Sequence, residues 1–202
     1  MRHLESGLSD VRAEIVTSTF VASGRPEGVR DLGRFLENLN NPAISQQIEL
    51  RSPSVRPLYR ATSQLALDAP LLVRRDQMIF ANFEGPHFNR DAAARASSID
   101  VPALLLVPPF QISGLVTVGQ EAEISQSLRS IAQTFFLMRN ARVFDADGAL
   151  LGEGEQIVVN GAAVQMLSAT RQHIAAIGSV PASRASEADT AASAPQEQTR
   201  AA

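Results

Sequence analysis

The acidic segment Asp145-Ala146-Asp147-Gly148, with Glu153 and Glu155 downstream, has residue types that could hold calcium. Hard cations prefer several carboxylate oxygens, but the spacing lacks the third aspartate and the terminal glutamate of a helix–loop–helix calcium loop. Aspartate at the start and glycine at the left-handed position are typical of a β-hairpin turn. We therefore interpret the segment as a turn and keep Asp145 and Asp147 as the metal candidates.

A second candidate site is the pair Arg30 and Arg34, which form the pattern R-x-x-x-R. The pattern resembles the first half of the cyclic-dinucleotide motif of PilZ domains, in which arginines bind phosphates and guanine, and this resemblance implies a nucleotide ligand. The partner motif D-x-S-x-x-G is absent from the chain. Both arginines fall in a predicted helix, one turn apart, where with Glu27 they would form its solvated face. The turn Arg74-Arg75-Asp76 is likewise interpreted as solvated.

Residue types for other chemistry are few. The histidines His3, His87 and His173 do not stand four residues apart or in an H-E-x-x-H pattern. Ser23 and Ser113 precede glycine, but neither lies in G-x-S-x-G, and a shared backbone turn accounts for both. The chain has no cysteine and no lysine, which removes disulfides, thiolate metal ligands and Schiff-base chemistry. The sequence favours a protein that is not an enzyme, with no cofactor and no catalytic residue.

Composition and charge narrow the class of protein further. The chain has 202 residues, enough for one ordinary domain or two small ones, and its 18 arginines against 21 acidic side chains give a net charge of −3. Such a balance lacks the basic excess that nucleic-acid binding needs. The longest apolar tract, Val101 to Val118, is interrupted by prolines, so no membrane span is predicted. The amino-terminal residues carry no signal-peptide pattern, and we expect a cytoplasmic protein.

The elements that must position these residues are organised as two similar segments, residues 13–83 and 101–168. The first shared feature is F-x-x-S-G, at Phe20–Gly24 and again at Phe110–Gly114. The second is an amphipathic helix after that glycine, with apolar residues at helical spacing from Val29 to Leu39 in the first segment and from Ile124 to Phe135 in the second. In the third feature an apolar strand reaches a short polar turn and a second apolar strand leaves it. The common order of the three features predicts an internal repeat.

Particular residues of the repeat carry testable expectations. Leu36 in the first helix and Leu128 in the second should both be buried against their own sheets, whereas Arg34 should face solvent. The terminal strand pairs align Leu72–Ile79 with Val158–Gln165. In the first segment, Arg51 to Pro57 takes the place of the Asp145–Gly148 turn and is predicted to be a longer hairpin loop. If the segments are copies of one fold, their strands should follow the same order.

The predicted fold is α+β and β-rich, with two related small β-sheet or half-barrel units, each covered by one helix. The units are 13–83 and 101–178, separated by a linker at 84–100 with a helical stretch at Asp91 to Ala96, and we expect them to pack face to face across a pseudo-two-fold axis. Whether each is a barrel or an open sheet is left open. Residues 179–202 lack the apolar side chains that folding requires and are predicted to be a disordered tail.

The second segment, with its paired strands, short helix, D-x-D-G-type hairpin and V-V-N-G-A-A-V, resembles a bacterial family of small domains of unknown function whose members end in a similar strand pair. The resemblance covers Val101 to Leu167 and, loosely, Ala13 to Phe83, and it implies a fold rather than an activity. We expect a non-enzymatic binding or scaffold protein that recognises a protein partner of unknown identity through a sheet edge or loop. The alternative is a sensor that binds a small molecule or nucleotide in the cleft between the repeats. Homo-oligomerisation is left open.

Overall fold

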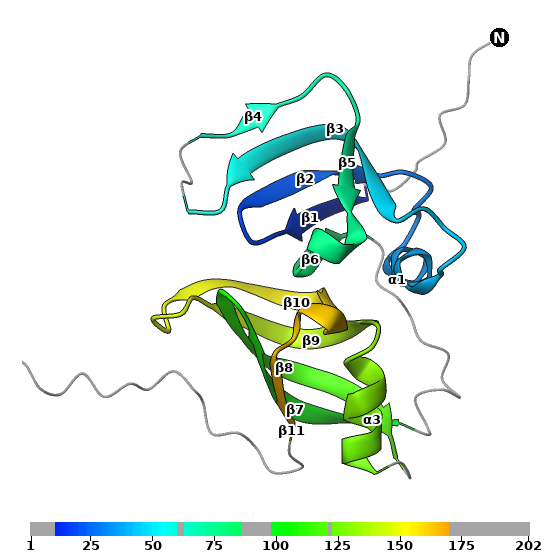
Figure 1. Ribbon diagram of the computed structural model, residues 1–202, viewed down its shortest axis with the longest axis vertical. Coiled ribbons are helices and arrows are strands. Elements are labelled where there is room, and N and C mark those ends of the chain that lie inside the picture. The colour runs from blue at the N-terminus through cyan, green and yellow to red at the C-terminus, as the bar shows by residue number, and fades with distance from the viewer. Residues whose placement is uncertain (1–10, 60–62, 86–97, 121–122, 170–202) are drawn as a thin grey trace, which may run out of the picture.

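The structure is a computed structural model that describes residues 11–59, 63–85, 98–120 and 123–169. In this part of the chain the protein is β-rich with two α-helices, as the sequence predicted, and its strands form one open antiparallel sheet in the order β11-β7-β8-β9-β10-β6-β1-β2-β3-β4, with β5 also paired to β3 (Figure 1). The predicted tail 179–202 and the helical stretch expected in the linker lie outside the described residues.

The first half of the chain contributes six strands and one α-helix. The strand that follows β3 is divided into two short strands, β4 and β5, which pair with different parts of β3. The elements are β1 (Arg12–Val16), β2 (Phe20–Pro26), α1 (Leu32–Asn40), β3 (Gln47–Pro57), β4 (Leu65–Ala66), β5 (Leu71–Arg74), the 3₁₀ turn η1 (Arg75–Gln77) and β6 (Phe80–Glu84).

The second half repeats this arrangement with an unbroken fourth strand. Its elements are β7 (Ser98–Val107), β8 (Phe110–Gly119), α3 (Ile124–Ile131), β9 (Phe135–Phe144), β10 (Leu150–Asn160), the 3₁₀ turn η2 (Gly161–Ala163) and β11 (Met166–Ala169). Both halves have the same strand order, β6-β1-β2-β3-β5 in the first and β11-β7-β8-β9-β10 in the second. The shared order is the one expected of two copies of one fold, and a common origin of the halves stays a prediction.

The equivalence of the halves extends to single residues at a β-bulge. The register of β2 on β3 shifts at Gly24, and that of β8 on β9 shifts at Gly114. Opposite each glycine one residue has a left-handed backbone, Ser52 with φ 47° and Asn140 with φ 48°. A Cβ at Gly114 would lie 2.8 Å from the carbonyl oxygen of Arg139, so only glycine fits there. The repeated S-G therefore marks a bulge inside a strand and not the turn predicted from the sequence.

The halves join edge to edge, which corrects the expected face-to-face packing. Strand β6 of the first half pairs with β10 of the second, in the register Ile157↔Asn82, Val158↔Ala81 and Val159↔Phe80 (Figure 1). This contact is head to tail, because the last strand of one half meets the fourth strand of the other. A pseudo-two-fold contact would instead bring the same strand from both halves together.

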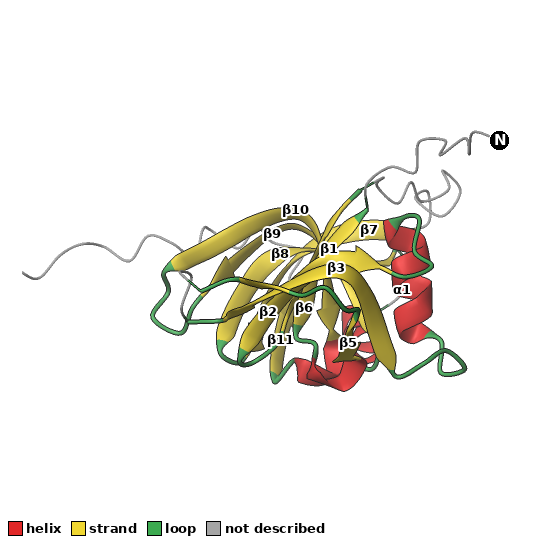
Figure 2. Ribbon diagram, turned by 90° about the horizontal axis from the view of Figure 1, so that it is seen from above, coloured by secondary structure: helices red, strands yellow, loops and turns green. Residues whose placement is uncertain are grey.

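The helix α1 begins where its sequence provides a cap. The side chain of Asp31 accepts a hydrogen bond from the backbone amide of Arg34 at 2.8 Å, as an N-cap residue does. Leu32, Phe35 and Leu39 are buried, and Arg34 is exposed as predicted. These side chains fix the face of α1 that packs on the core of the first half. Figure 2 shows α1 beside the strands of the sheet.

The two leucines expected at the centre of the helix faces are only half-buried. Both Leu36 in α1 and Leu128 in α3 retain partial exposure. Leu36 packs at the margin of the core of the first half and also lines a pocket, and Leu128 packs at the margin of the core of its half. The sequence pattern identified the apolar face correctly but placed its centre too far toward these residues.

Arg75 corrects a second expectation, because its side chain is buried and not solvated. Its guanidinium donates hydrogen bonds to the carbonyl oxygens of Asn38 and Leu39, both at 2.9 Å, and of Asn41 at 3.1 Å, at the carboxyl end of α1. The equivalent residue of the second half is Gly161, where a Cβ would lie 2.5 Å from the carbonyl oxygen of Ile131 at the end of α3. One half therefore caps its helix with an arginine, and the other closes the backbone directly onto it.

Two boundaries differ from the sequence-based expectation. The segment Arg51 to Pro57 was predicted to be the loop of a hairpin, but it continues β3 as a strand. The bulge at Ser52 bends that strand, so its two prolines are tolerated. Phe135, expected on the second helix, opens β9 because the helix ends at Ile131.

Buried side chains of the two halves mix across the junction. Val16, Val21 and Phe80 of the first half belong to the core of the second, and Phe80 meets the ring of Phe110 edge-on at 5.4 Å between ring centres. In return, Val158 lies in the core of the first half. The halves therefore share their hydrophobic burial and form one continuous structure.

Candidate functional site

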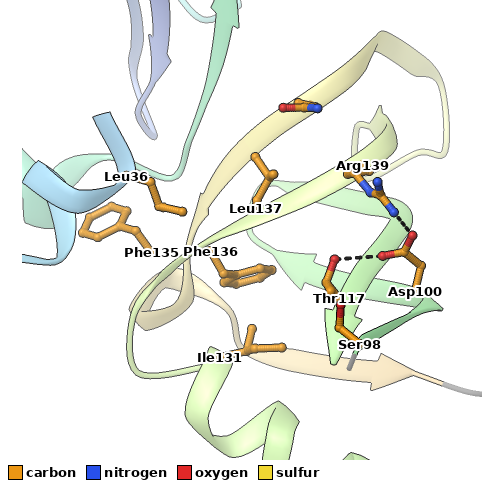
Figure 3. A pocket seen from close by; sticks show the side chains of 10 residues that line it. Leu36, Ser98, Asp100, Thr117, Ile131, Phe135, Phe136, Leu137 and Arg139 are labelled. Carbon is orange, nitrogen blue, oxygen red and sulfur yellow. Dashed lines mark hydrogen bonds and ion pairs between the residues drawn. The ribbon is translucent and has the colours of Figure 1, made fainter. Parts of the chain in front are cut away.

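A pocket of about 560 Å³ lies where α1 of the first half approaches the sheet of the second half. Its apolar wall combines residues from three elements, Leu36 of α1, Ile131 of α3 and Phe135, Phe136 and Leu137 of β9 (Figure 3). The pocket lies between the two halves, and the binding of a small molecule there stays a prediction.

The opposite wall of the pocket is polar. Arg139 of β9 forms an ion pair with Asp100 of β7, and the hydroxyl of Thr117 on β8 donates to the same carboxylate at 2.8 Å (Figure 3). Cross-strand pairing on the sheet brings these three residues together, because β8 lies between β7 and β9. One side of the pocket is thus charged and the other aromatic and aliphatic.

Two buried polar atoms at this pocket lack a hydrogen-bond partner among the described residues. They are the Nε of Arg139, a donor, and the Oε1 of Gln156, an acceptor on β10. Buried polar groups are normally paired, so these two residues of the pocket lining are candidates for contact with a bound molecule that supplies an acceptor and a donor. An amide or a comparable group beside an apolar body has this character.

The anchor that holds α1 at the pocket is the side chain of Asn40. Its Nδ2 donates to the carbonyl oxygen of Phe135, and its Oδ1 accepts from the amide of the same residue, both at 2.8 Å. The Asn40 side-chain amide thus both donates to and accepts from the backbone of one residue, as the backbone of a neighbouring strand does. This contact fixes the helix of the first half to β9 of the second, and with it the width of the pocket.

The arginines proposed as nucleotide ligands do not line this pocket. Arg30 is exposed and precedes the N-cap of α1, so it lies outside the helix in which it was expected. Arg34 is exposed on α1 and forms an ion pair with Glu37 at 3.1 Å.

The acidic candidates Asp145 and Asp147 lie in the β9–β10 hairpin turn. The Oδ1 of Asp145 accepts hydrogen bonds from the amides of Asp147 at 3.0 Å and Ala149 at 2.8 Å, and Gly148 has φ 82°. Within the described ranges, no three His, Asp or Glu side chains gather as a metal site. The three histidines lie outside the described residues.

The turn between β5 and β6 holds one exposed charged pair. Arg74 donates to both carboxylate oxygens of Asp76, from Nε at 3.0 Å and from Nη2 at 2.5 Å. This hydrogen bonding lowers the pKa of Asp76 below its ordinary value and raises that of Arg74. Both groups face solvent, as the sequence predicted for this turn, unlike their buried neighbour Arg75.

The two ends of the sheet form a second candidate surface. Among the described residues, β5 pairs with β3 alone and β11 with β7 alone, so each has one side without a neighbouring strand. Leu72 on β5 is 56% exposed, and Met166 on β11 is 63% exposed. Unpaired strand edges with exposed apolar side chains are sites where another strand can add.

Most of these residues were not singled out from the sequence. Arg139, Asp100, Thr117 and Gln156 come from four strands, and nothing in their spacing shows that the sheet places them together. Leu72 did carry a signal, because it belongs to the repeated strand pair and its counterpart Val158 aligns with it.

Comparison with known proteins gives no family. No protein-family model and no curated protein matches the chain. Among solved structures, an Sm protein of Pyrococcus abyssii in complex with a uridine heptamer is similar to part of it, with 20% identity and a TM-score of 0.26, over 41% of this chain and 100% of that one. A superposition of this quality carries no argument about fold or ligand. None of the helices in the described ranges has the length and apolarity to cross a membrane.

Proposed function

We propose that this chain is a non-enzymatic binding protein that recognises another protein through the edges of its sheet. The observation that supports this proposal is the pair of strands β5 and β11, which have no neighbouring strand on one side within the described residues and carry the exposed Leu72 and Met166. Addition of a strand satisfies main-chain groups and covers such side chains together. The proposal keeps the scaffold interpretation of the sequence and gives it a place on the molecule.

The experiment is affinity purification from the native host with three forms of the chain. A double variant, Leu72→Lys with Met166→Lys, places charges on both edges, and Leu151→Lys is a matched control because Leu151 is also 56% exposed but lies on the outer part of β10. We expect one set of proteins to co-purify with the wild type and the control and to be absent from the double variant. Recovery of the same proteins with all three forms would contradict edge recognition.

A second candidate function is the binding of a small molecule in the pocket between the halves. It is favoured by Arg139 and Gln156, two residues that line the pocket and that each have a buried polar atom without a hydrogen-bond partner among the described residues. A planar molecule with an amide group, such as a nucleobase or an aromatic carboxamide, complements both. Thermal shift with nucleosides, nucleoside monophosphates and benzamides tests this candidate. A rise in melting temperature that Gln156→Leu abolishes supports it, and no rise with any of these probes rejects that class of ligand.

A further inference from the structure

The free edges β5 and β11 correspond to strands that already pair with each other inside the molecule. Residue by residue, β5 is the counterpart of the end of β10, since Leu71–Arg74 pair with β3 as Ile157–Asn160 pair with β9. In the same way β11 is the counterpart of β6, since both pair with the first strand of their own half. The junction between β10 and β6 therefore has unused counterparts on the two ends of the sheet.

Side chains that are buried at the internal junction have exposed counterparts on β5 and β11, as expected of an interface without its partner. At the internal junction Val158 is 0% and Phe80 is 8% exposed. Their counterparts on the free edges are Leu72, 56% exposed, and Met166, 63% exposed. Large apolar residues occupy these positions although nothing among the described residues covers them.

A third position shows the same difference. Phe80 packs against Phe110 across the internal junction, and Phe110 is buried at 4% exposure. The counterpart of Phe110 in the first half is Phe20, which is only half-buried. Met166, the counterpart of Phe80, can contact the ring of Phe20 in another copy, since thioethers pack favourably on aromatic rings.

We propose that a second copy of this chain adds head to tail, its β11 pairing with the β5 of the first in the register of the internal junction. Transferred residue by residue, that register is Leu71↔Ser168, Leu72↔Leu167 and Val73↔Met166, with Met166 of one copy against Phe20 of the next. This inference rests on the proposed edge recognition and names its partner. Because each copy keeps one free edge of each kind, the contact is heterologous and continues beyond two copies, into a ring or a filament.

A buried polar residue of the internal junction has no equivalent at the proposed one, and this difference affects the strength of the contact. Asn160 closes the internal junction, with its side chain donating to the carbonyl oxygen of Met78 at 2.8 Å in a buried site. Its counterpart on β5 is the exposed Arg74, already paired with Asp76. The contact between copies therefore lacks the buried amide, and we expect it to be reversible and dependent on concentration.

The test uses the purified chain and two single variants, Leu72→Lys and Met166→Lys. Each variant loses one edge and keeps the other, so each alone should be monomeric by sedimentation velocity between about 1 µM and about 1 mM, whereas the wild type should associate beyond a dimer. An equal mixture of the two variants retains one competent pair of edges and should form a one-to-one dimer that grows no further. The control Leu151→Lys should associate as the wild type does.

Each alternative outcome contradicts the proposal. A monomeric wild type, or variants that still associate, would exclude this pair of edges. Association of one single variant but not the other would show pairing between two identical edges. A mixture that stays monomeric, with both variants folded by circular dichroism, would exclude the head-to-tail arrangement. If these results occur while edge variants still lose a host protein, the self-association fails and the recognition of a different protein stands.

Discussion

Replacement of Arg75 by methionine tests how the first half holds its helix. The guanidinium is 6% exposed and donates to four carbonyl oxygens, those of Asn38, Leu39, Asn41 and Ile44, at 2.9 to 3.3 Å. Methionine fills the volume but leaves these acceptors at the carboxyl end of α1 unpaired and removes a cation from the negative end of the helix.

The magnitude follows from the groups that lose a partner. An unsatisfied buried acceptor costs about 1 to 3 kcal/mol, and water can reach the outer three carbonyls more easily than that of Leu39, whose bond to Arg75 is the buried one. We expect the free energy of unfolding to fall by about 3 kcal/mol, which corresponds to roughly 6 to 12 °C in melting temperature for a chain of this size.

Urea unfolding followed by circular dichroism measures this change. Arg74→Met is the matched control, because the neighbouring side chain is exposed and bonds only to Asp76, and the free energy of unfolding should stay close to that of the wild type. Arg75→Lys should fall between the two, since an ammonium cannot reach all four carbonyls with the guanidinium geometry. A loss below about 1 kcal/mol for Arg75→Met would refute the capping role.

Three further predictions address the bulge, the helix and the exposed ion pair. Gly114→Ala should cost about 2 to 3 kcal/mol because its Cβ has no space, whereas Gly152→Ala, with nothing within 4 Å, should change the urea midpoint little. Leu32→Ala should destabilise by about 2 to 5 kcal/mol through lost burial and a cavity, and Arg34→Ala should stay within about 0.5 kcal/mol; equal losses would mean that the helix face is misassigned. The pKa of the Asp76 carboxyl, measured by NMR titration, should lie below its ordinary value and move back toward it in high salt. Because the pKa is lowered, the contribution of this group to stability is present above the ordinary pKa and is lost as pH falls through the lowered one. An unshifted titration would contradict the bond from the neighbouring arginine.

The fold class and the order of elements could be predicted because they depend on local patterns. The apolar spacing of the two helices, the aspartate–glycine hairpin and the repeated strand pair all lie within a few residues of one another in the sequence. The alignment of the two F-x-x-S-G motifs was also correct, since Gly24 and Gly114 occupy equivalent positions in the sheet.

What could not be predicted depends on contacts between distant segments. The burial of Arg75 requires the carboxyl end of α1, more than thirty residues earlier, to lie beside it. The pocket needs Arg139 and Asp100 to meet across β8, and the edge-to-edge junction needs β6 to meet β10. None of these pairings leaves a periodic signal in one segment of the sequence. Without a signal for pairing between β6 and β10, the two halves were expected to pack by their apolar faces.

Disulfide capture is the most direct test of head-to-tail association, because the natural chain has no cysteine. Leu72→Cys in one preparation and Leu167→Cys in another place thiols on residues that the proposed register pairs, and paired residues of antiparallel strands have Cα atoms about 4.5 to 5.5 Å apart, within disulfide range. Mild oxidation of the mixture should give a covalent dimer of the two variants in high yield, and a mixture of Leu151→Cys with Leu167→Cys should give little. Equal yields from both mixtures, or cross-linking of Leu72→Cys chiefly to itself, would contradict the account.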